Sequence, residues 1–219
     1  MSKSSPRDRL AQAAFDLFDE RGYEQTTVDE ITERAGLGRT TFFRYYRSKE
    51  DVIFPDHDLL LGLLGDRLRT TGQPTALTAV IDAVRLVLSH YLDEGEVARR
   101  RYRLTSTVPA LRDREIASVA RYQRLFREYI ADRASATAES ASLRAELMAA
   151  AVVAAHNHVL RRWLRGECRE PMRQFEDAMH QVAVLFASSD VDGTTIVAFR
   201  SGQDLDALLP ALRRLAEAP

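Results

Sequence analysis

Two short helical patterns, separated by a glycine-containing break within residues 27–50, constrain the fold of this chain most strongly. Thr27 and Glu30 have the spacing of a capping box, which predicts that the first helix begins here. Gly36 can adopt the left-handed conformation that ends such a helix, and the next helical pattern begins at about Arg39. A helix, a connection of three residues and a second helix are typical of a helix-turn-helix.

The second helical pattern separates an inward face from an outward face. A turn of about 100° per residue places Phe42 and Tyr46 on one side, which predicts that both rings are buried. The opposite side carries hydroxyl and guanidinium groups, which are poor core material but suit bases and phosphates. We therefore expect a double-stranded DNA partner, with Arg44 reaching either a guanine or only a phosphate. The candidate DNA contacts are Thr27, Arg39, Thr40, Thr41, Phe43, Arg44, Tyr45 and Lys49.

A further helix start follows immediately. Ser48 is the expected N-cap and Asp51 stands at the third helical position. Lys49 then lies where its ammonium group and the first backbone amides can hold one phosphate. Between Arg34 and Lys49 there are five basic residues and no acidic one, in a chain of formal net charge −1. Basic charge is therefore concentrated in the segment expected to face DNA.

Residues 5–54 resemble the N-terminal domain of TetR-type transcriptional regulators. The pattern that carries the resemblance is the run TVDEITERAGLGRTTFFRYYRSKED, which matches the family at almost every position. Three positions depart mildly: Gly38 stands where the family often has a capping serine, Phe43 where it often has tyrosine, and Tyr46 where it often has phenylalanine. Phe43 therefore lacks a hydroxyl group that could have bonded a phosphate.

The resemblance implies a function as well as a fold. Such regulators bind a roughly palindromic operator as a homodimer, most often as repressors that a small-molecule effector releases. Residues 100–115 are also similar to stretches in actinobacterial members, including some that sense acyl-CoA-like molecules. Two alternatives remain open: the chain activates transcription, or it has no effector and uses its C-terminal part only to dimerise or to contact another protein.

Other classes of protein fit the sequence poorly. The longest apolar run, Leu147–Ala155, is nine residues long, whereas a membrane helix needs about 20. A signal-peptide core is absent and Cys168 is the single cysteine, so we expect a cytoplasmic protein without disulfides. The histidines form no Glu-x-x-His or His-x-x-x-His pair, and there is no phosphate-binding glycine loop or nucleophile elbow. We therefore expect no metal, no cofactor and no enzyme activity.

Helical periodicity continues along the rest of the chain. We expect an all-α fold, with a three-helix DNA-binding domain over residues 1–50 and a helical ligand-binding and dimerisation domain over residues 51–219. Pro55 should kink or split the helix that starts at Lys49 and runs to about Leu68. The other expected helices cover residues 6–21, 77–92, 97–106, 109–133, 143 onward and 171–188, and residues 194–199 have strand character.

Residues 99–103 contain four arginines around Tyr102. They form either a solvated face paired with nearby acidic residues, or a site for an anionic ligand with Arg103 turned inward. We expect an effector pocket where polar atoms lie among apolar positions of the C-terminal helices. The candidate pocket residues are Tyr91, Tyr102, Arg103, Tyr122, Asn157, His158 and Trp163.

The run Leu147–Ala155 has no polar face, so this helix must be covered on two sides. Pairing of this helix and the next one with their copies in a second subunit would cover it, as in the dimers of TetR-type regulators. A helix buried deep within one subunit is the alternative. The candidate interface residues are Leu147, Ala151, Val152, Ala155, Phe175, Met179, Val182 and Phe186.

Overall fold

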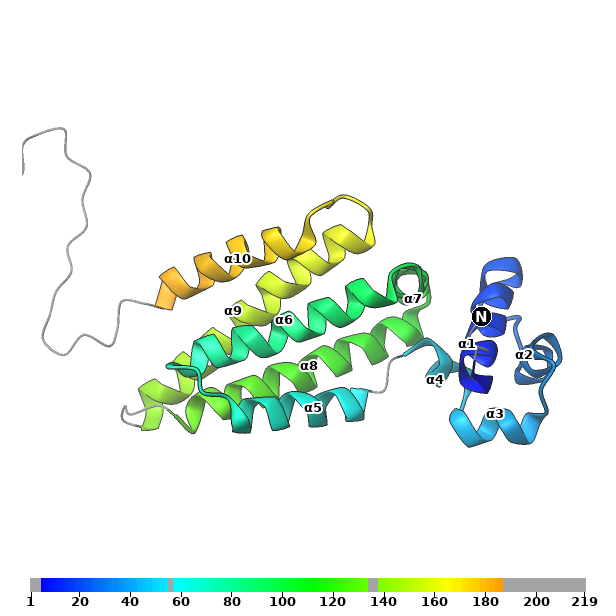
Figure 1. Ribbon diagram of the computed structural model, residues 1–219, viewed down its shortest axis with the longest axis horizontal. Coiled ribbons are helices and arrows are strands. Elements are labelled where there is room, and N and C mark those ends of the chain that lie inside the picture. The colour runs from blue at the N-terminus through cyan, green and yellow to red at the C-terminus, as the bar shows by residue number, and fades with distance from the viewer. Residues whose placement is uncertain (1–4, 55–56, 134–137, 187–219) are drawn as a thin grey trace, which may run out of the picture. The chain divides into compact units, whose positions relative to one another are not determined.

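The computed structural model describes residues 5–54, 57–133 and 138–186, and within these ranges the chain forms helices and no strand (Figure 1). This confirms the all-α prediction. The described residues up to Leu185 form one compact unit. The helices are α1 (Pro6–Arg21), α2 (Val28–Ala35), α3 (Arg39–Tyr45), α4 (Lys49–Ile53), α5 (His57–Thr70), α6 (Ala76–Glu94), α7 (Glu96–Thr107), α8 (Pro109–Ala131), α9 (Ala138–Leu164) and α10 (Pro171–Phe186).

The first two helices begin as their capping residues predict. The Ser5 hydroxyl accepts a hydrogen bond from the Asp8 amide at 3.1 Å, and the Asp8 carboxylate accepts one from the Ser5 amide. Thr27 and Glu30 form the same reciprocal box at the start of α2. Gly36 ends α2 in the left-handed conformation, with φ 62° and ψ 41°. These local contacts fix the angle at which α3 follows α2.

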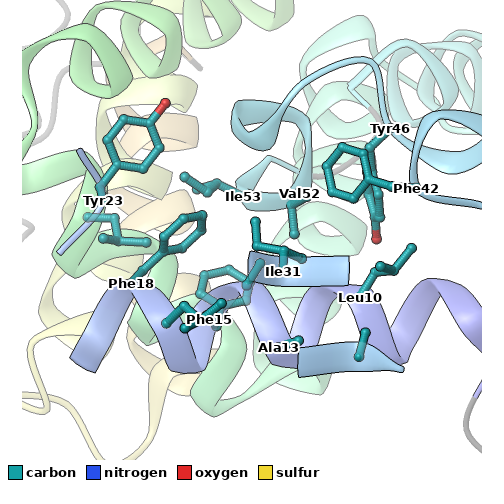
Figure 2. Close-up of a cluster of buried hydrophobic side chains, with 14 of the residues drawn as sticks. Leu10, Ala13, Phe15, Phe18, Tyr23, Ile31, Phe42, Tyr46, Val52 and Ile53 are labelled. Atoms are coloured by element: carbon teal, nitrogen blue, oxygen red, sulfur yellow. The ribbon is translucent and has the colours of Figure 1, made fainter. Parts of the chain in front are cut away.

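Buried side chains of α1 to α4 form one core cluster, shown in Figure 2. Leu10, Ile31 and Phe42 are fully buried in it. Leu104 of α7 and Leu111 of α8 belong to the same cluster, so the C-terminal helices complete the core of the N-terminal domain. A segment of about 50 residues buries too little surface to be stable alone, which explains why it borrows these side chains.

The helix expected from residue 49 to 68 is two helices, α4 and α5. Pro55, to which we ascribed a kink or a split, lies outside the described residues. Ser48 is the N-cap of α4, as predicted, but its side chain makes no capping hydrogen bond. Its hydroxyl group bonds the Glu50 carboxylate instead, and the Asp51 carboxylate accepts a hydrogen bond from the Arg47 amide at 3.1 Å.

Helices α5, α6, α8 and α9 pack side by side in the C-terminal part, with α7 across their end next to the N-terminal domain (Figure 1). Helix α9 begins at Ala138, earlier than the expected Leu143, because alanine and glutamate in this stretch favour helix over loop. Ile116 on α8 is 60% exposed. The segment 194–199, for which we expected strand character, lies outside the described residues.

Candidate DNA-contacting face and ligand cavity

Helix α3 separates its two faces as its periodicity predicts. Phe42 and Tyr46 are buried, with ring centroids 5.6 Å apart. On the other side the Phe43 and Tyr45 rings are 46% and 39% exposed, and Arg44 is exposed between them. A shallow surface hollow is lined by Arg39, Thr40, Thr41, Phe43 and Arg44. These five candidate DNA contacts therefore lie together on one accessible face.

The two arginines of this face lie against aromatic rings. The Arg39 guanidinium carbon is 5.3 Å from the Phe43 ring centroid, and that of Arg44 is 5.0 Å from the Tyr45 ring centroid. Arg39 also forms an ion pair with Asp29, in which both side chains are more than half exposed. An exposed ion pair contributes little, about 0 to 1 kcal/mol, so a phosphate can replace the Asp29 carboxylate as its partner.

Two further candidate DNA contacts make hydrogen bonds within the N-terminal domain. Thr27 is the N-cap of α2. The Lys49 ammonium donates to the carbonyl oxygens of Tyr23 at 2.9 Å and of Thr26 at 3.1 Å, and it lies 4.2 Å from the Tyr23 ring centroid. Lys49 thus holds the turn between α1 and α2. The signal that we missed is that a lysine beside a helix start can reach the carbonyl groups of a neighbouring turn.

A cavity of about 510 Å³ lies among α6, α7, α8 and α9. It adjoins a smaller inner chamber of about 50 Å³, and Tyr91, Glu115 and Asn157 line both spaces. Tyr102 lines the large cavity and Tyr122 lines the inner chamber. Four of the seven candidate pocket residues, Tyr91, Tyr102, Tyr122 and Asn157, are therefore brought together around these spaces.

Three other candidate pocket residues lie elsewhere. Arg103 is more than half exposed and pairs with Glu96 at 3.1 Å. His158 is exposed, and Trp163 is buried outside the two cavities, with its ring 4.9 Å from the Arg99 guanidinium carbon. The expectation that Arg103 turns inward is wrong, because the helical phase of α7 directs Arg101 inward in its place.

Arg101 is the buried arginine that the sequence analysis missed. It lines the large cavity and is 5% exposed. Its two terminal nitrogens donate to the Glu94 carboxylate at 2.7 and 2.9 Å, and its Nε donates to the carbonyl oxygen of Ile53 at 2.5 Å. The spacing of Ala98, Arg101 and Thr105, all buried, follows one face of α7 and could have identified it.

Arg100, the neighbouring residue, joins α7 to α1. Its guanidinium group contacts Asp16 at 2.8 Å and Asp19 at 2.9 Å, and it lies over the Phe15 ring. The ion pairs of Arg101 and Arg103 confirm that acidic neighbours balance the arginine cluster, but the side chains of Arg100 and Arg101 are only 13% and 7% exposed. The cluster is therefore in large part a set of contacts between helices.

Glu115 and His156 line the inner chamber, and neither was among the candidate pocket residues. Glu115 Oε2 and His156 Nε2 are buried and have no hydrogen-bond partner among the described residues. Burial raises the pKa of the Glu115 carboxyl. Burial also lowers the pKa of the His156 imidazole to about 4, so this ring is neutral at pH 7. His156 Nδ1 lies 3.3 Å from Asn157 Oδ1.

Comparison with known proteins decides the family. Residues 10–54 match the family model described as bacterial regulatory proteins, tetR family, and residues 75–187 match the MftR C-terminal domain. The second match spans slightly more than half of the chain. The chain belongs to the TetR family. It is a DNA-binding transcriptional regulator, with the helix-turn-helix in α2 and α3.

Curated relatives and solved structures support the assignment. This TetR-family chain is 27% identical over 169 residues to MftR of Mycobacterium tuberculosis, whose name links it to mycofactocin biosynthesis. The match covers 75% of this chain and 83% of that protein. It is 34% identical over 116 residues to the regulator TcmR of Streptomyces glaucescens, covering 48% and 50%. FadR of Thermus thermophilus, solved with lauroyl-CoA, shares the fold at 20% identity and a TM-score of 0.52. The structural match covers 89% of this chain and 100% of the FadR chain.

Four of the eight candidate interface residues are buried within one chain of this TetR-family protein. Val152, Phe175, Met179 and Val182 are at most 5% exposed without any second copy, so they form the core of their own subunit. Val152 is buried because one side of the apolar helix α9 packs on α6 and α8, and the other three residues are the buried residues of α10. Leu147 is 52% exposed, and Ala151, Ala155 and Phe186 are partly exposed.

Large apolar side chains remain exposed on the opposite side of α9 and on α10. Leu143 and Leu147 of α9 are 63% and 52% exposed, and Val184 and Leu185 of α10 are 56% and 72% exposed. The sequence analysis identified the two helices but not which side of each faces outward. Over the described ranges, no helix has the length and apolar character needed to cross a membrane.

Proposed function

We propose that this TetR-family regulator is a homodimeric repressor that binds a palindromic operator and leaves it when a small anionic effector enters the large cavity. The observation that carries the proposal is the position of Arg101. Its side chain lines the cavity, and it donates a hydrogen bond to the carbonyl oxygen of Ile53, the last residue of α4. One buried residue thus contacts both the effector space and the N-terminal domain.

The exposed face of α3 supports the DNA-binding part of the proposal. Hydroxyl groups of Thr40 and Thr41 and the guanidinium group of Arg44 are placed to meet base edges and phosphates in a major groove. The Phe43 ring suits packing against a sugar or a thymine methyl group. Two such helices in a symmetric dimer reach successive major grooves about 34 to 36 Å apart, which requires an approximate palindrome.

The rim of the large cavity supports an anionic effector. Arg112, Arg161 and Arg165 line it and are exposed. Arg165 pairs with Glu167 at 2.7 Å, whereas Arg161 has no ion pair among the described contacts. A volume of about 510 Å³ falls in the range of small-molecule sites, about 300 to 1,000 Å³. A guanidinium group binds carboxylate or phosphate through two parallel hydrogen bonds, so Arg161 is the residue that we assign to the anion.

The contacts of Arg101 supply the coupling. An effector held by Arg161 also contacts Arg101, which lines the same cavity, and draws its guanidinium group away from Glu94 and Ile53. Loss of the bond to Ile53 frees the end of α4 and changes the position of α3. An effector that favours the form with the poorer DNA geometry lowers the affinity for the operator. The operator then lowers the affinity for the effector by the same coupling free energy.

The exposed apolar side chains of α9 and α10 support the homodimer. Leu143, Leu147, Val184 and Leu185 lie on two successive helices and are each more than half exposed. Clusters of exposed apolar side chains of this size mark interaction surfaces. A twofold copy of the same two helices covers them with an isologous contact, in which the same surface patch of each subunit meets its equivalent.

The proposal is tested by DNA binding in the presence of a cavity ligand. A fluorescent duplex selected by the wild-type protein is titrated with protein, with and without saturating naphthoate as an anionic probe. We expect the probe to weaken DNA binding by about fivefold or more, within the usual range of allosteric coupling. In the Arg161→Ala variant the probe should bind poorly and leave the DNA affinity unchanged. A probe that binds the protein without changing DNA affinity would contradict effector release.

A further inference from the structure

We propose that the inner chamber is a subsite for a hydrogen-bond donor, such as a hydroxyl group, at the end of the effector opposite its anionic group. This inference rests on the proposed function of the large cavity as the effector site. The residues that define the subsite are Glu115 and His156, whose side chains line the chamber and each carry a buried polar atom without a partner.

The chamber is otherwise mainly apolar. Its volume is about 50 Å³, and His156 at its wall is 7% exposed. A buried polar atom without a hydrogen bond destabilises a protein, so two such atoms in one small chamber favour a ligand that completes their hydrogen bonds. The apolar side chains around them are Val84, Val87, Val119, Phe126, Val153 and Leu160, and the other polar residues of the wall are Tyr91, Ser118, Tyr122 and Asn157.

Both unpartnered atoms are hydrogen-bond acceptors. With the Asn157 amide oriented so that Oδ1, which only accepts, faces His156 Nδ1 at 3.3 Å, the proton of the neutral His156 ring lies on Nδ1. His156 Nε2 therefore presents a lone pair. Glu115 Oε2 also accepts while its carboxyl group is ionised, and a hydroxyl group can still donate to His156 Nε2 when that carboxyl is protonated. Two acceptors in one chamber select a ligand group that donates, which a methyl or methylene group cannot do.

The two cavities are adjacent, because they share lining residues. Tyr91, Glu115 and Asn157 line both, together with Val119 and Leu160. One ligand can therefore place its anion at Arg161 and its other end between Glu115 and His156. The rings of Tyr91 and Phe126 line the route and favour an apolar, aromatic body. The ligand class is an elongated aromatic anion with a hydroxyl group at the far end.

The test measures direct binding of matched probes by calorimetry. Naphthoate and biphenyl carboxylate are each compared with the analogue that carries a hydroxyl group at the end opposite the carboxylate. Two probe lengths are used so that one of them spans the cavities. We expect the hydroxylated member of at least one pair to bind about tenfold more tightly to the wild-type protein, the value of a hydrogen bond of about 1.4 kcal/mol. A buried water that already completes both bonds would remove this preference and overturn the proposal.

Three variants locate the preference. His156→Phe removes the acceptor and keeps a ring beside Phe175, which packs edge-on at 6.4 Å. Glu115→Met removes the other acceptor at similar volume. In each of these two variants, the affinity for the hydroxylated probe divided by the affinity for its parent probe should fall toward one. The matched control is His158→Phe, because this exposed histidine of the same helix lies outside the cavities. Its ratio should equal that of the wild type.

The outcomes separate this inference from the proposed function. Equal affinities within both pairs, no binding of any hydroxylated probe, or a preference that survives both variants would overturn the subsite. If naphthoate weakens DNA binding but no preference exists, the effector function stands without the subsite. If the preference exists but DNA binding never changes, the subsite stands and effector release fails. Should one variant not fold, as circular dichroism reports, the other variant carries the test.

Discussion

Arg101 Nε donates a hydrogen bond to the carbonyl oxygen of Ile53 at 2.5 Å, from a side chain that is 5% exposed. Ile53 ends α4 in the N-terminal domain, whereas Arg101 lies on α7 and lines the cavity. Glu94 binds both terminal nitrogens of the same guanidinium group. Arg101 is therefore the one residue in these hydrogen bonds that contacts the cavity, α6 and the end of α4.

Arg101→Lys should weaken this link while keeping the charge that Glu94 needs. A lysine ammonium cannot form the paired hydrogen bonds to Glu94 and the bond to Ile53 together. We expect the free energy of unfolding to fall by about 1 to 3 kcal/mol in urea titrations. The matched control is Arg103→Lys, because Arg103 pairs with Glu96 on the exposed side of the same helix and should change stability by less than about 0.5 kcal/mol. Equal losses in the two variants would argue against a special role for Arg101.

Arg44→Ala should relax sequence specificity. Its guanidinium group lies on the exposed face of α3, supported by the Tyr45 ring at 5.0 Å. If Arg44 reads a guanine, its loss costs about 1 to 3 kcal/mol at one base position of each half-site and little on unrelated DNA. Fluorescence anisotropy on the selected duplex and on single-base variants measures this. A loss of the same size on every duplex would assign Arg44 to a phosphate.

Lys49→Ala should act mainly on stability. The ammonium group donates to backbone carbonyl groups of Tyr23 and Thr26, so its removal leaves those oxygens without this donor. We expect the free energy of unfolding to fall by about 1 to 2 kcal/mol, as measured by urea titration. Affinity for all DNA sequences should fall together. A variant as stable as the wild type, with a DNA salt slope lower by about one, would instead support a direct phosphate contact.

Leu147→Glu should dissociate the homodimer. The Leu147 side chain is 52% exposed on the outer side of α9, and a carboxylate there would have to be buried without a partner at a twofold interface. Sedimentation velocity should show a monomer. Leu63→Glu is the matched control, because Leu63 on α5 is similarly exposed, at 57%, and lies outside the proposed interface. An intact dimer in Leu147→Glu would place the interface elsewhere.

His156→Phe should stabilise the protein and flatten its acid sensitivity. The variant removes an unpartnered buried nitrogen, which favours the folded state by about 1 kcal/mol at pH 7. Burial lowers the pKa of His156 to about 4 in the folded protein, below the usual value near 6.5. Between pH 6.5 and 4 the imidazole is therefore protonated in the unfolded chain but not in the folded one. Wild-type stability should therefore fall, relative to the variant, as the pH falls from about 6.5 to 4, by at most about 3 kcal/mol.

Urea unfolding of the wild type and of the His156→Phe variant, at matched protein concentrations and over this pH range, measures the difference in their stability. Glu115 is present in both proteins, so its own pKa shift cancels from the comparison. Parallel stability curves for the two proteins over this pH range would show that His156 is not held neutral by burial.

Local chemistry made much of the N-terminal domain predictable from the sequence. Thr27, Glu30 and Gly36 fix the ends of α2 through contacts within a few residues, and the burial of Phe42 follows from helical phase. These features depend on short-range geometry, which the sequence contains directly.

Features set by packing between distant helices could not be predicted in the same way. Which arginine of α7 turns inward depends on where α4 and α6 lie, and this decides between Arg101 and Arg103. An apolar helix such as α9 has no polar side to show which face packs on its own subunit, so Val152 was assigned to the wrong surface. Lys49 is held by carbonyl groups about 25 residues away in the chain, beyond any local pattern.

Selection of bound duplexes from a random DNA library, at two salt concentrations, tests the central claim most directly. A homodimer with α3 in successive major grooves should enrich an approximate palindrome whose half-site centres lie about one helical turn apart. Its affinity should fall steeply with salt, because basic side chains displace counterions from phosphates. Enrichment of a single unpaired half-site, or of no sequence at all, would contradict the account.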